Sequence, residues 1–450
     1  MRKKLAFAVV LLLAAALAAW AALRSHDKPE WTTRSPAALA EFRRGLDAER
    51  KYYGAEARGH YRRALALDPS FAAARVMVLR GLKPEDPLTK PTIARLAKTD
   101  RSKLTAREAL LVDYQLDWER QQRGAAQARL ERYLAAHPRD PYALQMQIEW
   151  LWQDRQWPRA EKTCQELLAI DPNWLTAQNY LGYLAMSQGH FAEAEDRFRT
   201  YRYVAPDQAN PHDSLGELLA LLGRWDDARR ELEASLAVRP DFCASYYHLG
   251  QMALMRRDFA TNGRELERAR RQPACAGYEL EAHTCGQRLW ESYARHDWAA
   301  LSQAFDSSCE QKTRSSFWMS HLGAVMAGDL ARARAIEATV AKWNADAGPQ
   351  GQALVAHLQG VRLVAEGDPR AAGERFAAVD GAVSYFGLDF GTFKLYNRLQ
   401  WAHAAEQAGD AARARQLVAE VAAVNPTFAE LYRRGEVVLP RPLAPVARAK

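Results

Sequence analysis

The chain has 450 residues and a formal net charge of +8. A single compact core rarely extends beyond about 250–300 residues, so this length indicates several domains or a repeat array whose units contact only their neighbours. Residues 1–30 carry five basic and two acidic side chains, and over most of the chain both signs are interspersed. Nucleic-acid-binding proteins concentrate basic residues on one face, so the distribution argues against that class of protein. Ala, Leu and Arg are abundant, which favours an all-α fold.

Residues 1–24 are predicted to be a membrane-targeting segment. Arg2, Lys3 and Lys4 precede the uncharged residues 5–23, which as a helix would span about 28 Å. An uncleaved signal anchor is favoured, because the hydrophobic region of a signal peptide has about 7–15 residues. Cleavage after Ala21 remains the alternative. We expect a single-pass inner-membrane protein whose body faces the periplasm or exterior, or a secreted periplasmic protein if cleavage occurs. Residues 25–35 are predicted to be a linker.

Residues 139–274 are marked by an internal period of 34 residues. Four series of positions keep this period: prolines, small residues twelve positions before a proline, aromatic residues, and Leu-Gly pairs. They are Pro138, Pro172, Pro206 and Pro240; Ala160, Ala194 and Ala228; Trp157, Phe191, Trp225 and Phe259; and Gly182, Gly216 and Gly250, each after a leucine. Agreement of four series indicates a true repeat.

This pattern resembles the tetratricopeptide repeat (TPR) family, whose unit is a helix–turn–helix of 34 residues. The resemblance is to membrane-anchored bacterial members. It implies a right-handed superhelical solenoid of antiparallel helix pairs, here preceded by one hydrophobic helix. Each pair has an apolar stripe that only stacking on its neighbours buries.

The pattern continues with less regularity on both sides of this array. Residues 36–138 are predicted to form irregular TPR-like repeats, because Ala57, Tyr61, Ala64 and Pro69 reproduce the second-helix signature. Residues 275–435 are predicted to form expanded, divergent repeats, with Gly-Asp turns at Gly328, Gly367 and Gly409. Residues 436–450 are rich in proline and are predicted to be a disordered tail.

Five cysteines occur, and none has the spacing of a metal site. Free or buried thiols are one interpretation. The alternative is a disulfide among Cys275, Cys285 and Cys309, which would need an oxidising compartment. The sequence leaves the pairing open.

The TPR resemblance also implies a ligand groove on the concave face, lined by the first helix of each unit. Placing the prolines at position 32 of the repeat selects residues with amide, aromatic and carboxylate side chains. The candidate partner-binding residues are Tyr142, Gln145, Glu149, Trp152, Asn179, Tyr183, Asp213, Glu217, Tyr247 and Gln251. No Lys or Arg occupies the selected positions, so a peptide backbone bound by amide side chains fits better than a clamped carboxyl terminus.

No nucleotide-binding, metalloprotease, nucleophile-elbow or EF-hand motif occurs. We therefore expect no catalytic residue, no metal, no cofactor, no small-molecule substrate and no nucleic acid. The predicted function is a non-catalytic scaffold or adaptor, tethered to the membrane, that binds a protein or peptide segment. A regulatory or sensor subunit of a neighbouring envelope enzyme or assembly machine is the alternative. An enzyme with an unrecognised site in residues 275–400 is the third hypothesis.

Overall fold

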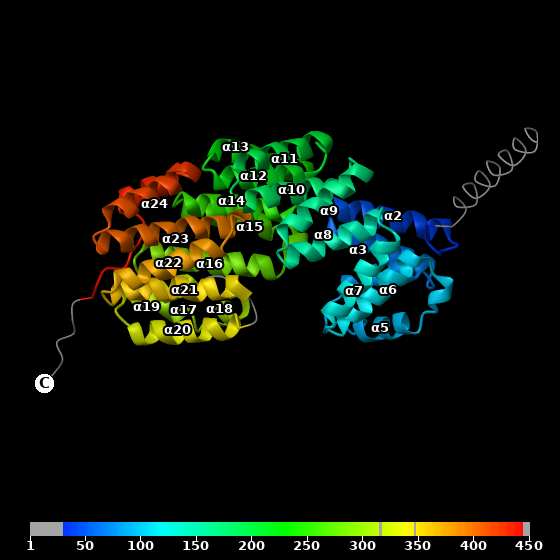
Figure 1. Ribbon diagram of the computed structural model, residues 1–450, viewed down its shortest axis with the longest axis horizontal. Coiled ribbons are helices and arrows are strands. Elements are labelled where there is room, and N and C mark those ends of the chain that lie inside the picture. The colour runs from blue at the N-terminus through cyan, green and yellow to red at the C-terminus, as the bar shows by residue number, and fades with distance from the viewer. Residues whose placement is uncertain (1–29, 315–316, 346–347, 444–450) are drawn as a thin grey trace, which may run out of the picture. The chain divides into compact units, whose positions relative to one another are not determined.

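The computed structural model describes residues 30–314, 317–345 and 348–443. These residues fold almost entirely into α-helices and contain no strand (Figure 1), in agreement with the predicted all-α class. Contacts divide the chain into two compact units, Met1–Gln156 and Trp157–Lys450. The predicted membrane segment, residues 1–24, lies outside the described part. None of the helices within the described part is long and apolar enough to cross a bilayer.

The first unit consists of helices that pack against their neighbours in sequence. They are α2 (Pro36–Arg50), α3 (Gly54–Leu67), α4 (Ala72–Arg80), α5 (Thr89–Ala97), α6 (Ala106–Glu119), α7 (Arg123–Ala136) and α8 (Pro141–Gln153), with a 3₁₀ turn η1 (Arg101–Lys103) before α6. Helix starts follow the local sequence. Thr105 and Glu108 form a reciprocal capping box at α6, and the Asp140 carboxylate accepts from two backbone N–H groups at α8.

The residues just before α2 belong to the core of the first unit. Trp31 is 2% exposed and packs edge-to-face on Phe42, with ring centroids 4.8 Å apart. Thr32 donates from its N–H (3.0 Å) and its hydroxyl (2.9 Å) to the buried Glu108 carboxylate. Residues 31 and 32, placed in the predicted linker, are therefore fixed parts of this unit.

The second unit contains the larger set of helices. They are α9 (Trp157–Ile170), α10 (Leu175–Ser187), α11 (Phe191–Val204), α12 (Ala209–Leu221), α13 (Trp225–Val238), α14 (Cys243–Met255), α15 (Phe259–Arg270), η2 (Pro273–Cys275), α16 (Tyr278–Ala294), α17 (Trp298–Ala304), α18 (Ser308–Thr313), α19 (Phe317–Met326), α20 (Leu330–Trp343), α21 (Gly348–Ala365), α22 (Pro369–Ala382), α23 (Gly387–Gln407), α24 (Ala411–Val424) and α25 (Pro426–Arg433).

In four helix pairs, a glycine on the first helix faces a large side chain on the second, sixteen residues later. A Cβ on Gly182 would lie 2.4 Å from the Phe198 ring, and one on Gly216 would lie 2.7 Å from Leu232. The same pairing occurs at Gly45 with Tyr61 and at Gly360 with Phe376, in the segments that the sequence marked as irregular. The two helices approach closely because glycine leaves room for the ring.

The Gly-Asp turns of the expanded repeats lie where the sequence predicted them. Gly328, Gly367 and Gly409 have φ of +79°, +84° and +83°, a region that glycine enters without steric cost. The aspartate that follows each glycine caps the next helix, accepting from the backbone N–H three residues later. These turns reverse the chain between α19 and α20, α21 and α22, and α23 and α24.

Four of the five cysteines form two disulfides in the second unit. Cys243 at the start of α14 pairs with Cys275 in η2, and Cys285 in α16 pairs with Cys309 in α18. Cys164 is a buried free thiol. Of the three cysteines expected to supply a disulfide, Cys285 and Cys309 pair with each other, whereas Cys275 pairs with Cys243, which was not among them. Its separation of 32 residues from Cys275 is close to one repeat, and equivalent positions of stacked repeats lie side by side.

We predict that Gly182→Ala lowers the free energy of unfolding by about 1–3 kcal/mol, because the added methyl overlaps the Phe198 ring in a filled core. Gly381→Ala on α22 is the matched control, since a Cβ there meets no atom within 4 Å. Denaturant titration followed by far-UV circular dichroism measures both. Equal stability of the two variants would contradict the close-packing role of Gly182.

Candidate functional site

Six of the candidate groove residues lie together on one face of α10, α12 and α14, which we call the inner face of the second unit. They are Asn179, Tyr183, Asp213, Glu217, Tyr247 and Gln251. Hydrogen bonds join them across the helices. The Ser214 hydroxyl donates to Asn179 Oδ1 (3.0 Å), and the Tyr183 hydroxyl donates to Glu217 Oε2 (2.6 Å). Partner binding by these six residues stays a prediction.

The inner face is covered by the amino-terminal half of α23. The N–H of Leu388 donates to Glu217 Oε1 over 2.7 Å, so a carboxylate meets the positive end of the α23 dipole. Gly387 has φ of +65°, and a Cβ there would lie 3.1 Å from the same oxygen. Gly391 packs directly on Leu221 of α12. In this structure the inner face is therefore filled by the protein's own chain.

The loop before α23 extends this cover onto α10. The Tyr385 N–H donates to the carbonyl of Ser187 (3.2 Å), and the Phe386 ring packs edge-to-face on Tyr183 with centroids 5.7 Å apart. The covered helix α12 is buried on nearly every side, including its polar residues Asp213 and Glu217. Buried polar groups are stable only when they are hydrogen-bonded, and here the covering segment supplies part of the bonding.

His248 is the positive charge at the centre of this face. Its Nδ1 lies 3.0 Å from Asp213 and its Nε2 lies 3.4 Å from Glu217. Burial lowers the pKa of His248, but the two carboxylates outweigh burial and raise that pKa to about 10. Burial and the charge on His248 lower the pKa of the nearby His283 to about 4. The imidazolium of His248 thus bridges two carboxylates, while His283 is neutral.

The remaining four candidates, Tyr142, Gln145, Glu149 and Trp152, lie half-buried on α8 of the first unit. Gln145 donates to Glu149 Oε1 (3.0 Å), and Arg80 pairs with the other oxygen of Glu149 at 3.6 Å. The Arg107 guanidinium lies 4.6 Å from the centre of the Tyr142 ring. Arginines that the repeat register did not select therefore adjoin this face.

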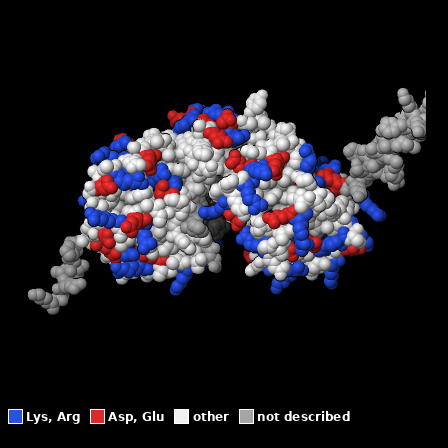
Figure 2. Space-filling view, in the orientation of Figure 1, with Lys and Arg blue, Asp and Glu red and all other residues white. Residues whose placement is uncertain are grey.

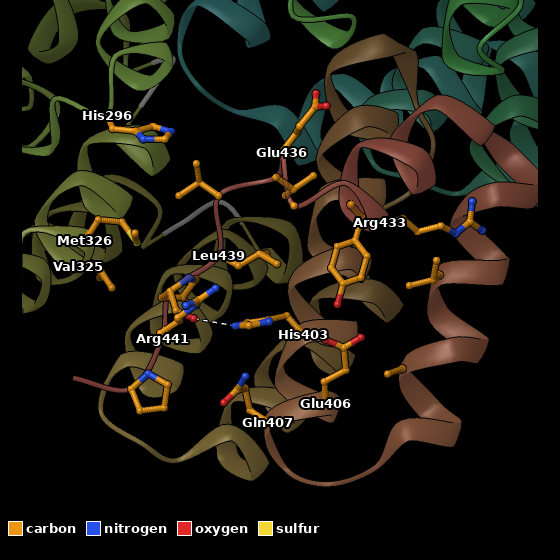
Figure 3. Close-up of a pocket in the computed structure, with 18 of the residues that line it drawn as sticks. His296, Val325, Met326, His403, Glu406, Gln407, Arg433, Glu436, Leu439 and Arg441 are labelled. Atoms are coloured by element: carbon orange, nitrogen blue, oxygen red, sulfur yellow. Dashed lines mark hydrogen bonds between the residues drawn. The ribbon is translucent and has the colours of Figure 1, made fainter. Parts of the chain in front are cut away.

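A groove of about 1660 Å³ lies elsewhere in the second unit, along the extended residues 436–443, which we call the strap (Figure 3). Its walls come from the end of α23, from α24 and α25, and from residues near α17 and α19. Side chains of the body hold the strap backbone. Tyr293 Oη accepts from the N–H of Val438 (3.0 Å), and Figure 3 shows His403 directed at the strap, where its Nε2 lies 2.7 Å from the carbonyl of Pro440.

The strap differs from the disordered tail predicted for residues 436–450. Besides these contacts, Arg257 donates to the carbonyl of Glu436, and the Leu443 N–H donates to the carbonyl of Ala365 (2.9 Å). Prolines prevent a helix here, as predicted, but an extended chain leaves its backbone groups available to partners on the body. Residues 444–450 lie outside the described part.

No cluster of three or more His, Cys, Asp or Glu side chains suited to a metal ion occurs in the described part of the chain. Cys285 is bonded to Cys309, so it offers no thiol to His283. On the face that Figure 2 shows, basic and acidic side chains are interspersed on each unit, in agreement with the charge pattern of the sequence.

The residues that cover the inner face, Tyr385 to Asp389, were not predicted from the sequence. One signal was present: α23 carries large apolar side chains on all its sides, a pattern typical of a helix buried all round. The strap contacts Tyr293, Tyr396 and His403 had no sequence signal, because they come from three different helical turns and share no motif.

Comparison with known proteins shows which class of fold the chain has. No protein-family model and no curated protein matches the chain. Among solved structures, it is similar to the crystal structure of the APC/C hetero-tetramer Cut9-Hcn1, with 13% identity and a TM-score of 0.50 over 88% of this chain and 76% of that one. A tetratricopeptide repeat protein from Parabacteroides merdae ATCC 43184 matches with 14% identity and a TM-score of 0.39, over 54% of this chain and 93% of that chain. The chain therefore has the fold of a TPR-type helical repeat solenoid.

The pKa of His248 predicts how the stability of the second unit depends on pH. A proton held by the folded protein up to pH about 10, but released by the unfolded chain near pH 6.5, stabilises the fold below pH 6.5. This contribution should be lost progressively as the pH rises from about 7 to 10. Urea unfolding at several pH values, followed by tryptophan fluorescence, measures the loss.

His248→Gln is the control for this measurement, because other buried groups also titrate. The variant should be less stable than wild type at pH 6, and the difference should shrink towards pH 10. A difference that is constant over this pH range would show that His248 is not protonated in the folded state.

Proposed function

We propose that the protein is a non-catalytic scaffold that holds an extended segment of a partner protein in the groove beside the strap. The TPR-type fold generally serves protein interaction, and one observation supports this particular place: the groove already holds an extended piece of polypeptide. Its volume of about 1660 Å³ also exceeds the range of about 300–1,000 Å³ that is usual for small ligands.

The chemistry of the groove suits such a segment. The strap backbone is bound by tyrosine, histidine and arginine side chains, which recognise carbonyl and N–H groups of any sequence. The wall that faces the strap combines apolar Val418 and Tyr432 with charged Glu406 and Arg433. A partner segment with apolar side chains and mixed charge would find contacts for both.

We further propose that the protein is tethered to the inner membrane through residues 1–24 and that its body faces the periplasm or exterior. Three basic residues before an uncharged run of membrane-spanning length support the tether. The pairs Cys243–Cys275 and Cys285–Cys309 support an oxidising compartment, because disulfides are rare in the cytosol.

The inner face of the second unit is not part of this proposal, because α23 covers it. One part of the predicted concave groove could still bind a partner: the face of α8 that carries Tyr142, Gln145, Glu149 and Trp152. We treat it as the competing surface in the experiment below.

The experiment is site-specific photocrosslinking in native membranes. A photoreactive amino acid at Val418, which lines the groove, should capture the same partner repeatedly, whereas one at Gln416, which is exposed on α24 outside the groove, should not. Ala419→Trp fills the groove from an exposed position and should reduce capture at least fivefold. Circular dichroism checks that the variant is folded.

Two outcomes would overturn the assignment to the strap groove. Capture of the same partner at Gln416 would show that the groove has no special role. If a photoreactive amino acid at Trp152 captures the partner and Ala419→Trp does not reduce this capture, the partner binds the α8 face instead.

The compartment has a separate test. In the denatured but unreduced protein, only Cys164 should react with a maleimide, and all five cysteines should react after reduction. Mass spectrometry of protein from rapidly acid-quenched cells counts the modified thiols. Five reactive thiols without reduction would contradict an oxidising compartment.

A further inference from the structure

The second unit contains a second cavity, of about 460 Å³, which adjoins the strap groove because Arg257 and Val437 line both. Its wall is formed by side chains of α14, α15, α16, α19, α21, α23 and α25. The volume lies within the range of about 300–1,000 Å³ typical of small-molecule sites. Size alone therefore fits a small organic ligand.

Aromatic rings dominate this wall. Trp290, Trp318, Phe390, Phe393 and Tyr396 all line it, and all five are only half-buried. Trp290 and Trp318 lie edge-to-face with centroids 5.7 Å apart, and Trp318 lies 5.4 Å from Tyr396. Large rings in a repeat interior are normally covered, so aromatic surface left uncovered at a cavity marks a place for a ligand.

The wall carries one acidic and one basic side chain, Asp389 and Arg257. Arg257 is already engaged: its guanidinium donates to Tyr293 Oη (3.3 Å), lies 4.8 Å from the centre of that ring, and donates to the strap carbonyl of Glu436. Asp389 has a neutral partner, the amide of Gln251. Asp389 is exposed and lines the cavity, so its carboxylate is accessible to a ligand there.

The groups around Asp389 make this end of the cavity electronegative. Desolvation and the nearby Glu217 raise the pKa of Asp389, and His248 opposes this shift; the single charge of His248 is shared between Asp213 and Glu217. His283, which also lines the cavity, is neutral. Asn262 is 2% exposed and lines the cavity as well, and its Oδ1 has no hydrogen-bond partner among the residues that the structure describes. The wall therefore offers negative charge and an unsatisfied acceptor, and its one cationic side chain is occupied.

We infer that this cavity binds a small organic ammonium ion with an apolar body. The ammonium group lies beside Asp389, where the carboxylate neutralises it, and the apolar body lies among the rings of α16, α19 and α23. Aromatic rings attract a desolvated ammonium group through their quadrupoles when it lies within about 6 Å of the centroid. An anionic ligand would lie beside the carboxylate of Asp389 with no cation to pair with either group, so the cavity should not bind it.

The test uses the purified full-length protein in a nonionic detergent, with benzyltrimethylammonium as the probe. Its uncharged isostere, neopentylbenzene, has the same shape, and benzoate is the anionic comparison. Binding is followed by tryptophan fluorescence, to which Trp290 and Trp318 contribute, and by the shift in melting temperature. The cation should bind at least tenfold more tightly than neopentylbenzene, and benzoate should not bind.

Two variants and a control separate the site from non-specific binding. Asp389→Asn should weaken binding of the cation at least tenfold and leave neopentylbenzene unchanged. Ala282→Phe, which fills the cavity, should weaken both. Glu374→Gln changes the net charge equally at an exposed position of α22 and should have no effect.

Several results would overturn the inference. These are equal affinity for cation and isostere, no effect of Asp389→Asn on binding of the cation, and no binding of either probe. Because the strap groove is tested by crosslinking at other residues, failure of one proposal leaves the other intact.

Discussion

The carboxylate of Glu217 is the contact on which the form of the second unit depends. One oxygen accepts a hydrogen bond from the Tyr183 hydroxyl, the other accepts one from the N–H of Leu388 in the first turn of α23, and His248 lies beside it. These bonds attach a late helix to an early one. By holding α23 against α10 and α12, they convert a stack of repeats into a body in which α23 lines both the cavity and the strap groove.

Such a contact is energetically demanding, because buried carboxylates are costly unless each is paired and hydrogen-bonded. Here the requirement is met by residues from three parts of the chain: tyrosine and histidine from neighbouring repeats and a helix amino terminus from α23. Removal of any one partner leaves the others with an unmet charge or donor. The polar face therefore specifies which helix docks and in what register, a role that an apolar surface alone serves poorly.

Much of the fold follows from local sequence. The 34-residue spacing correctly predicted the helix pairs of the regular array, and the Gly-Asp motifs correctly predicted the later turns, since each depends on nearby residues. Asn179, Tyr183, Asp213 and Glu217 lie together on one face, and partner binding by them stays a prediction. The helix that covers that face, α23, could not be predicted from local spacing and motifs. Leu388 meets Glu217 across 171 residues, and repeats of uneven length intervene. The attachment of Trp31 to the first unit and the course of the strap depend in the same way on contacts between distant segments, for which periodicity carries no information.

The distance in sequence between Glu217 and Leu388 also bears on how the chain acquires its structure. Repeat arrays usually fold from neighbour to neighbour, so that each finished unit is already stable. In the second unit, α12 keeps its buried carboxylates and apolar residues uncovered until 171 further residues have been synthesised. A long-range closure of this kind slows folding and couples distant repeats. The second unit should therefore unfold in one cooperative transition rather than fray from its end. The nascent chain should depend on a chaperone until α23 has been synthesised and can pack on α12.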